Sequence, residues 1–399
     1  MTSAIVVFSR LRWDFVYHRP QHLLSRLAAH YPVVFVEEPV HCETGPFFSS
    51  HSPAPGVLVC RPHTPAAVPG FHDAQLPYLR TLLRQAVQDY DEHIAWFYAP
   101  GALPLLGELQ ARLVVYDCLG EPGADPAAAA RENELLKAAD IVLACGPSLY
   151  RALRARHPNT HYFPNSVETG HFARALERAN SHPAHRNIPG PRLGFHGVID
   201  RRFDSGLAAR LADAHPQWQI VLVGPVTDID PASLPRRPNM HYLGPQPYDA
   251  LPLFLAGWDV CLLPFALNEA TRFANPVKTL EYMAAELPIV STPVADVAEM
   301  HGNLVSIARN PQEFIAACET ALLAPRQELQ AKAAQMRRVL AATSWKASAE
   351  RLRALLESAG RRSQEPALPA QRELHRNRFG IGRTFSAGRD QTENAAPLA

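Results

Sequence analysis

The 399-residue sequence lacks several features that would place it quickly in a class. It contains no apolar run of about 18 residues, the length of a membrane-spanning helix, and no basic-then-apolar signal precedes its first strand-like segment. No C-x-x-C pair occurs among its six cysteines, which argues against a zinc site and a disulfide framework. We therefore expect a protein of the reducing cytoplasm that needs no metal and no cofactor.

Charge of one sign in excess is also absent. The 39 basic and 38 acidic residues nearly cancel, so no global field attracts nucleic acid. No G-x-G-x-x-G pattern follows a strand-like run, which makes a dinucleotide oxidoreductase the least favoured enzyme class.

Apolar residues are abundant, at 47% of the chain, and they follow a repeating order. Short apolar runs alternate with helical patterns in two series, which begin near residues 4 and 193. This alternation predicts an α/β protein with two doubly wound parallel sheets, because helices connect parallel strands across both faces. The polar, proline-bearing stretch 176–191 is the predicted linker between domains 1–180 and 190–343.

The segment from Asn275 to Ser291 is the most informative. Asn275 is a good N-cap and Pro276 suits the first helical position, so we expect a helix from Pro276 to about Ala285. Lys278 and Glu281 then lie three residues apart on one face. A lysine near a helix N-terminus favours phosphate, and a carboxylate one turn later can accept hydrogen bonds from a ribose diol. Together they point to a sugar nucleotide.

At these residues the chain resembles the retaining glycosyltransferases of the GT-B fold, the large family-four/family-one group. These enzymes carry a P-x-K-x-x-E-Y-x-A-x-G-x-P-V-V-S-type segment. The resemblance implies two Rossmann-like domains that face each other across a cleft, with Glu281 on the donor ribose and a basic residue on the diphosphate. Two departures stand out. Phe273 replaces an earlier family glutamate, and Glu286 replaces the helix-ending glycine, so we expect that turn to close differently.

Other segments of the C-terminal series match the same group. Gly197 lets the backbone approach a ligand, and Arg201 and Arg202 offer paired donors for phosphate. The family's G-x-I-x-x-R-x-D loop meets the diphosphate here, and its nucleobase site lies near Gly244. The further donor-site candidates come from the family pattern N-E-A-T-R-F-x-x-P-x-K, and they are Thr271, Arg272 and Asn275.

The N-terminal series carries a second dense segment, in which the family reads W-D-x-x-x-x-R-P-Q-H. Trp13 is a candidate for stacking on an acceptor sugar or for pinning the loop to the core. His18 and Arg19 are candidates for acceptor contact at the start of the first helix. Asp117 matches a family acid in Y-D-C-M-D-E, whereas Gly120 replaces the second acid of that motif.

The resemblance also implies that an amphipathic helix at 344–360 crosses back onto the N-terminal domain. From 361 to 399 the chain is polar and poor in large apolar residues, so we expect a disordered tail.

The predicted function is the transfer of a sugar from a nucleotide donor to a cell-envelope or exopolysaccharide glycan, with retention of anomeric configuration. Lys278 and Arg202 are the predicted catalytic cations, and Asp117 is the candidate catalytic carboxylate. The basic N-terminal loop suggests a lipid-linked acceptor and peripheral contact with the inner face of the membrane. A non-catalytic sugar-nucleotide-binding partner and a sugar-nucleotide epimerase of the same fold are the alternatives.

Overall fold

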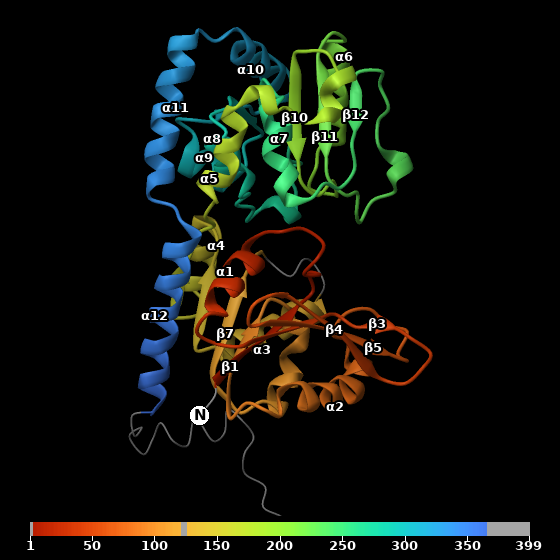
Figure 1. The fold of residues 1–399 in the computed structure, drawn as a ribbon, viewed down its shortest axis with the longest axis vertical. Helices are drawn as coiled ribbons and strands as arrows, with labels where there is room; N and C mark the ends of the chain where they lie inside the picture. Colours follow the sequence, from red (N-terminus) through yellow and green to blue (C-terminus); the bar gives the residue numbers. More distant parts are fainter. Residues whose placement is uncertain (1–2, 121–125, 365–399) are drawn as a thin grey trace, which may run out of the picture.

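The structure, a computed structural model, describes residues 3–120 and 126–364 of the chain. Two α/β halves stand one above the other in Figure 1, and each is built around its own sheet. Within the described ranges, no helix combines the length and hydropathy needed to cross a lipid bilayer.

The N-terminal half contains a nine-stranded sheet in the order β3-β5-β2-β1-β6-β7-β8-β9, with β4 paired beside β5. Only the β4–β5 pair is antiparallel. The strands are β1 (Ser3–Ser9), β2 (Val33–Glu37), β3 (Val40–His41), β4 (Phe47–Ala54), β5 (Val57–Thr64), β6 (Glu92–Phe97), β7 (Ala111–Cys118), β8 (Ile141–Ala144) and β9 (Thr160–Tyr162). Its central strands are apolar at almost every position because both faces are covered.

Helices and turns on the two faces of this sheet enclose two core clusters. They are α1 (Arg19–Leu27), η1 (Asp73–Gln75), α2 (Leu76–Val87), η2 (Pro100–Glu108), α3 (Pro126–Ala138) and α4 (Pro147–Arg154). The sequence pattern does not predict the β4–β5 hairpin, since β4 is largely exposed and polar.

The C-terminal half contains a six-stranded, fully parallel sheet in the order β12-β11-β10-β13-β14-β15. Its strands are β10 (Arg192–His196), β11 (Gln219–Val223), β12 (Met240–Tyr242), β13 (Val260–Leu263), β14 (Ile289–Ser291) and β15 (Ser306–Ile307). The helices are α5 (Thr169–Phe172), α6 (Ser205–Ala214), α7 (Leu251–Ala256), α8 (Lys278–Ala284), α9 (Ala295–His301), α10 (Pro311–Leu323) and α11 (Arg326–Ala341). Short 3-10 turns are η3 (Ala173–Leu176), η4 (Arg178–Asn180), η5 (Pro183–Asn187), η6 (Pro231–Ser233), η7 (Tyr248–Ala250) and η8 (Glu269–Thr271). The predicted α/β class with parallel sheets is confirmed.

The predicted linker at 176–191 is wrong. Phe172, Ala175 and Ile188 are buried in the C-terminal core together with α7, so this stretch is part of that half. The chain passes between the halves earlier, after β9, where Phe163 still belongs to the N-terminal core and Val167 already belongs to the C-terminal one. Proline and polar residues mark 3-10 turns here, not a free connection.

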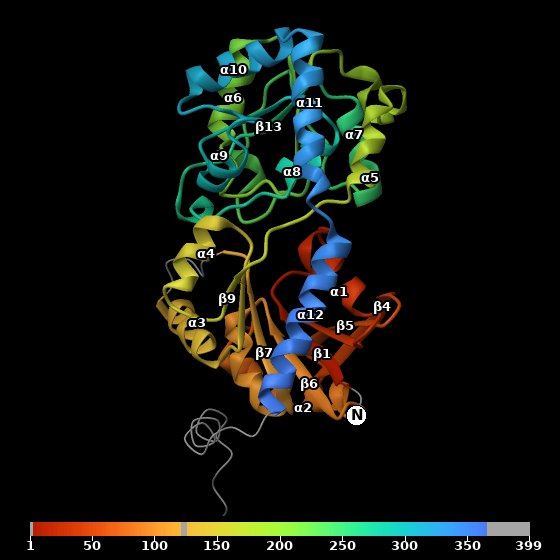
Figure 2. The same cartoon turned by 90° about the vertical axis from the view of Figure 1, so that its left-hand side faces the viewer.

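The chain returns to the N-terminal half through the last described helix, α12 (Trp345–Gln364), which continues from the direction of α11 (Figure 2). Trp345, Leu352 and Leu356 are buried in the N-terminal core. The ring of His22 stacks on Trp345 with centroids 4.7 Å apart. The tail expected to be disordered, 361–399, lies outside the described residues except for 361–364, which belong to α12.

The segment that was expected to form a helix from Pro276 begins its helix two residues later, at Lys278. Asn275 is not its N-cap, because the Asn275 side chain donates a hydrogen bond to the carbonyl of Cys145 in the other half. Glu286 adopts a left-handed conformation with φ 54°, so the turn closes as it does with glycine. That conformation costs about 1 kcal/mol, and an ion pair between Glu286 and Arg337 of α11 opposes the cost.

A second contact joins the halves away from α12. Gly146 precedes α4 and has no side chain to cap it, but the Asp296 carboxylate of α9 accepts a hydrogen bond from the Ser148 N–H at 3.1 Å. The fit requires glycine, since a Cβ on Gly146 would lie 2.0 Å from Asp296 Oδ2. Asp296 is thus an N-cap supplied by the opposite half. The exposed ion pair of Arg151 and Glu299 lies beside it.

We expect Asp296→Ala to loosen the contact between the two halves. A lost N-cap costs about 1 kcal/mol, and this cost falls only on the conformation in which α4 and α9 meet. Small-angle X-ray scattering of the ligand-free protein is then expected to give a larger radius of gyration than wild type. Arg151→Ala, which removes only an exposed ion pair, is the control. Equal radii for Asp296→Ala and wild type would contradict the role of Asp296.

Candidate active site

Lys278, the first residue of α8, lies over the backbone of Gly197 at the end of β10. A Cβ on Gly197 would come within 1.9 Å of Lys278 Cε and 2.5 Å of Nζ. Gly197 has φ +135°, and a Cβ on its neighbour Gly224 would lie 2.0 Å from the Gly197 carbonyl oxygen. Two glycines at the ends of adjacent parallel strands therefore make the space in which the ammonium group lies.

Glu281 is one turn further along α8 and is 6% exposed. Its Oε2 is 3.3 Å from Nε2 of His196, the last residue of β10. That nitrogen lacks the geometry of a hydrogen bond, so the contact between Glu281 and His196 is a close approach only. The Tyr282 hydroxyl accepts a hydrogen bond from the His196 backbone N–H at 3.1 Å and joins α8 to the sheet edge.

Burial dominates the electrostatics of this group. It raises the pKa of Glu281 to about 7, although Lys278 opposes the shift. It lowers the pKa of Lys278, and Arg202 adds to this effect while Glu281 counters it. The pKa of His196 falls well below its usual value through burial and the nearby Lys278. The site therefore holds a cation and a carboxylate that are only partly compensated, which is typical of a place where a ligand completes the charges.

The loop after β10 places two arginines at the rim. Asp200 accepts hydrogen bonds from Arg202 Nε at 3.0 Å and Nη2 at 2.6 Å. This pairing orients the Arg202 guanidinium, and among the described residues its Nη1 has no hydrogen-bond partner. Arg201 is exposed, and its carbonyl accepts a hydrogen bond from Asn268. Both arginines remain candidates for binding an anion.

His18 approaches the same group from the N-terminal half. It is partly buried, and desolvation together with Lys278, His22 and Arg202 lowers its pKa to about 4. The Gln21 side chain fixes its position, since Gln21 Oε1 accepts from the His18 N–H and Nε2 donates to the carbonyls of Trp13 and Val16. A neutral imidazole is therefore held in the cleft, where it can exchange hydrogen bonds with a sugar.

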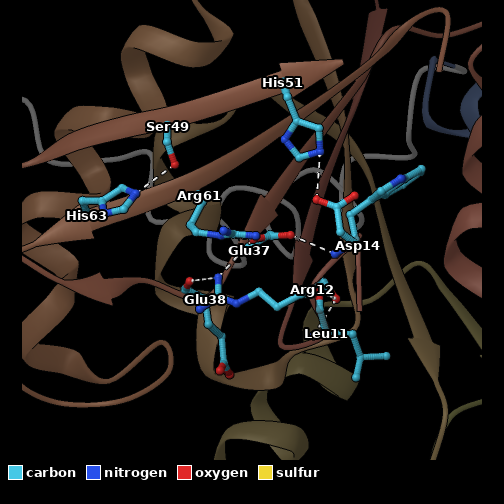
Figure 3. Close-up of polar contacts among 11 residues, drawn as sticks. Leu11, Arg12, Asp14, Glu37, Glu38, Ser49, His51, Arg61 and His63 are labelled. Carbon is cyan, nitrogen blue, oxygen red and sulfur yellow. Dashed lines mark hydrogen bonds and ion pairs between the residues drawn. The ribbon is translucent and has the colours of Figure 1, made fainter. Parts of the chain in front are cut away.

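A buried glutamate anchors the loop that carries His18 (Figure 3). Glu37 ends β2, and its Oε1 accepts from the Trp13 N–H at 2.8 Å. Its Oε2 accepts from Arg12 Nη1 at 3.1 Å and Arg61 Nε at 2.6 Å. Trp13 is 6% exposed, and its ring packs edge-on against Phe35. Of the two roles predicted for Trp13, the structure therefore supports pinning of the loop to the core and not stacking on an acceptor sugar.

Arg19 and Asp117 bind each other. Arg19 Nε lies 3.1 Å and Nη2 2.9 Å from the Asp117 carboxylate, and Arg19 Nη1 donates to the carbonyl of Phe163 at 2.8 Å. Both residues are at most 2% exposed. The acceptor contact predicted for Arg19 and the catalytic role predicted for Asp117 conflict with this closed pair. The pair instead ties α1 to the ends of β7 and β9.

In the loop before α8, two of the residues predicted to bind the donor instead form hydrogen bonds within the protein. Thr271 is buried, and its Oγ1 donates to the carbonyl of Ala266 and accepts from the Asn268 N–H, so it closes the loop and does not face a diphosphate. The Asn275 side chain donates a hydrogen bond to the Cys145 carbonyl, and the Asn275 carbonyl accepts one from the Asn165 side chain. Asn275 therefore links the two halves and does not make the predicted contact with the sugar-nucleotide donor. Arg272 is exposed and remains a candidate.

Phe273, at the place of a family glutamate, packs against the N-terminal core cluster, and the guanidinium of Arg272 lies 5.1 Å from its ring centroid. No carboxylate replaces the family acid at this position. The side chain instead gives the loop an apolar contact with the opposite half.

An aromatic hollow of about 500 Å³ adjoins the Glu281 side of the cleft. Tyr248 in its wall is within electrostatic range of Glu281, and its ring stacks on His171 with centroids 4.4 Å apart. Gly244, with φ +67° and open space around a Cβ, precedes this wall on the chain. The hollow is lined by Tyr17, His22, Arg26, Glu168, His171, Pro247, Tyr248 and Asp249.

Sequence reasoning missed Glu37, Gln21 and Asp296, which position the site without entering it. The signal for Glu37 was present, since it follows four apolar residues of a buried strand and so lies at the carboxyl edge of the sheet. Asp296 carried no local signal, because its partner lies 148 residues away. In the described part of the chain, no group of three or more histidine, cysteine or acidic residues has the arrangement of a metal site.

The chain is similar in sequence and in fold to known glycosyltransferases. Residues 201–324 match the profile of the family "Glycosyl transferases group 1". A Bacillus subtilis (strain 168) protein, named as the teichuronic acid biosynthesis glycosyltransferase TuaH, is 26% identical over 277 residues, which cover 63% of this chain and 69% of that protein.

Two solved structures are similar in fold. The sucrose-phosphate synthase of Thermosynechococcus elongatus has a TM-score of 0.69 and 16% identity, over 90% of this chain and 99% of that one. Anabaena Alr3699/HepE, in complex with UDP and glucose, has a TM-score of 0.63 and 14% identity, over 89% and 99%. The predicted GT-B fold is confirmed.

We expect Gly197→Ala to destabilise the protein through backbone strain and to displace the ammonium group of Lys278. A φ of +135° lies outside the left-handed helical region that an alanine can adopt, and such strain costs about 1–3 kcal/mol. The overlap with Lys278 adds little to this cost, because the flexible end of the lysine side chain can move. Gly244→Ala is the control, since its φ of +67° is left-handed helical and nothing lies within 4 Å of the added Cβ. Urea unfolding measures both losses of stability, and a loss in Gly197→Ala no larger than in Gly244→Ala would contradict the need for glycine at position 197.

Proposed function

We propose that the chain transfers a sugar to a growing cell-envelope or exopolysaccharide glycan with retention of anomeric configuration. The similarities described above support a nucleotide-sugar-dependent glycosyltransferase of the GT-B fold. The observation that carries the proposal is the partly compensated pair of Lys278 and Glu281 beside Gly197. The profile match covers this pair, and the relative from Bacillus subtilis is named for teichuronic acid biosynthesis.

The two charged residues suit different parts of a donor. Glu281 is the ribose ligand, since its carboxylate can accept hydrogen bonds from both hydroxyls of the diol. Lys278 is the diphosphate ligand, with Arg201 and the open edge of Arg202 at the rim. The nucleobase then extends toward Gly244 and the aromatic wall that contains Tyr248. UDP is the first nucleotide to test, because the Anabaena neighbour is in complex with UDP.

The proposed reaction needs no protein base. The bond between the anomeric carbon and the diphosphate oxygen breaks, a bond from the acceptor oxygen to the same face of that carbon forms, and the acceptor proton passes to the diphosphate oxygen. Lys278 and Arg202 stabilise the negative charge that develops on the diphosphate. His18, neutral through its lowered pKa, is suited to a hydrogen bond with the transferred sugar. Closure of the two halves excludes water.

We expect Glu281→Ala and Lys278→Ala to fail in different ways. Loss of a charge-assisted hydrogen bond weakens binding by about 1.5–3 kcal/mol, so Glu281→Ala raises the Kd of the donor by about 10- to 100-fold. Loss of the cation that faces the leaving group lowers kcat by about 100-fold or more, so Lys278→Ala mainly affects turnover.

A thermal-shift screen of UDP, GDP, ADP and their sugar derivatives, followed by assays of nucleotide release, measures both effects. Wild-type activity in both variants would overturn the site. Nucleotide-sugar binding by wild type without any turnover would favour a non-catalytic binding partner.

We expect donor binding to depend on pH through Glu281. Its pKa is about 7 without ligand, and a bound diol stabilises the carboxylate, so binding releases a proton and affinity rises with pH. UDP-glucose is then bound about tenfold more weakly at pH 6 than at pH 8. Its diphosphate diester has no group that titrates in this window, and His18, with a pKa of about 4, stays neutral. Isothermal titration calorimetry checks this, and a slope retained in Glu281→Gln would contradict the assignment.

A further inference from the structure

Two consecutive glutamates at the end of β2 have opposite surroundings. Glu37 is fully buried and bonded to Trp13, Arg12 and Arg61. Glu38 is partly buried, and its carboxylate has no hydrogen bond or ion pair among the described residues. Figure 3 shows its side chain extending away from the network around Glu37. A carboxylate in this situation is only partly solvated and has no protein partner, which is costly unless a ligand supplies one.

The residues around Glu38 leave its carboxylate uncovered. Arg12 bonds to the Glu38 backbone carbonyl and to Glu37, not to the Glu38 carboxylate. Gly70, with φ +67°, passes beside it, and a Cβ there would lie 3.3 Å from Glu38 Oε1. Burial raises the pKa of Glu38, while Arg12 and Arg10 oppose the shift. The carboxylate is therefore enclosed on one side by loop backbone and remains open on another.

Arg10 is the second open group at this edge. It follows β1, which pairs with β2, so Arg10 and Glu38 lie at the carboxyl ends of adjacent parallel strands. Arg10 is exposed, and its guanidinium has no hydrogen bond or ion pair among the described residues. Each is within electrostatic range of the other, yet they form no ion pair. One hydrogen-bond acceptor and one anion-binding donor thus lie just beyond the ends of two paired strands.

This edge faces the cleft. Ligands of doubly wound sheets bind beyond the carboxyl ends of the strands. Arg12, whose guanidinium bonds to the Glu38 carbonyl, belongs to the loop that brings His18 within electrostatic range of Lys278. Glu38 therefore lies in the N-terminal half, at the sheet edge that carries this loop.

We propose that Glu38 and Arg10 form the acceptor subsite, in which Glu38 accepts hydrogen bonds from ring hydroxyls and Arg10 binds an anionic group of the same sugar. The acceptor is then an anionic hexose unit, carrying either a carboxylate or a phosphate. This inference rests on the proposed function, since it names the second substrate of the same cleft. A neutral sugar would use Glu38 alone.

The test is an NMR titration of the full chain with glucuronic acid, glucose 6-phosphate and glucose, each with and without UDP. Glu38→Gln is expected to weaken binding of all three sugars by about tenfold or more, as expected for loss of a charge-assisted hydrogen bond. Arg10→Gln is expected to weaken binding of the two anionic sugars only, and the tighter of these two identifies the anion. The dissociation constant of UDP is expected to stay that of wild type in both variants.

Glu43→Gln, which changes an exposed glutamate five positions further on, is the matched control. Equal sugar binding by Glu38→Gln and Glu43→Gln would overturn the proposal and make Glu38 a solvated surface group. So would a wild-type protein that binds glucose as tightly as the anionic sugars, or that binds none of the three. Failure of wild type to bind any nucleotide would instead contradict the proposed function, and the titrations without UDP keep the two failures distinguishable.

Discussion

The rest of the site depends on the burial of two opposite charges one helical turn apart. Glu281 is buried and Lys278 is half-buried, and each shifts the pKa of the other toward its charged form without offsetting the cost of desolvation. This arrangement is possible only because Gly197 and Gly224 leave backbone where side chains would otherwise stand. A ligand can therefore offset a free-energy cost already present in the free protein, and under the proposed function this links donor affinity to the protonation of Glu281.

Around this pair, buried polar groups hold the loops in place and do not take part in chemistry. The Arg19–Asp117 pair and the Glu37 network are both closed, with the hydrogen-bonding capacity of the acids directed to protein groups. They position the loop that carries His18. Among the described residues, the charged groups that remain open include Lys278 and Glu281 in the C-terminal half and Glu38 and Arg10 in the N-terminal half.

The sequence predicted those features of the site that depend on residues close together in the chain. Lys278, Glu281 and Gly197 were predicted as site residues because their signals are local: a helix start, a three-residue spacing and a glycine at a strand end. The structure brings these three residues together. Thr271 was predicted to contact the donor, and Trp13 either to stack on an acceptor sugar or to pin its loop, but both side chains hold their own loops. A polar residue near a cleft looks the same in sequence whether it points inward or outward, since its partners lie far away in the chain.

The sequence by itself determined the α/β class, the two parallel sheets and the helix that carries the charged pair, because apolar periodicity and local spacing are properties of short segments. Only the tertiary structure decided where the chain crosses between the halves, that Asp117 is consumed by Arg19, and that Glu37 is closed while Glu38 is open. These outcomes depend on which residues, distant in the chain, lie close enough to bond a given side chain in the folded protein. The sequence around Glu37 and Glu38 does not show which of the two glutamates has such partners.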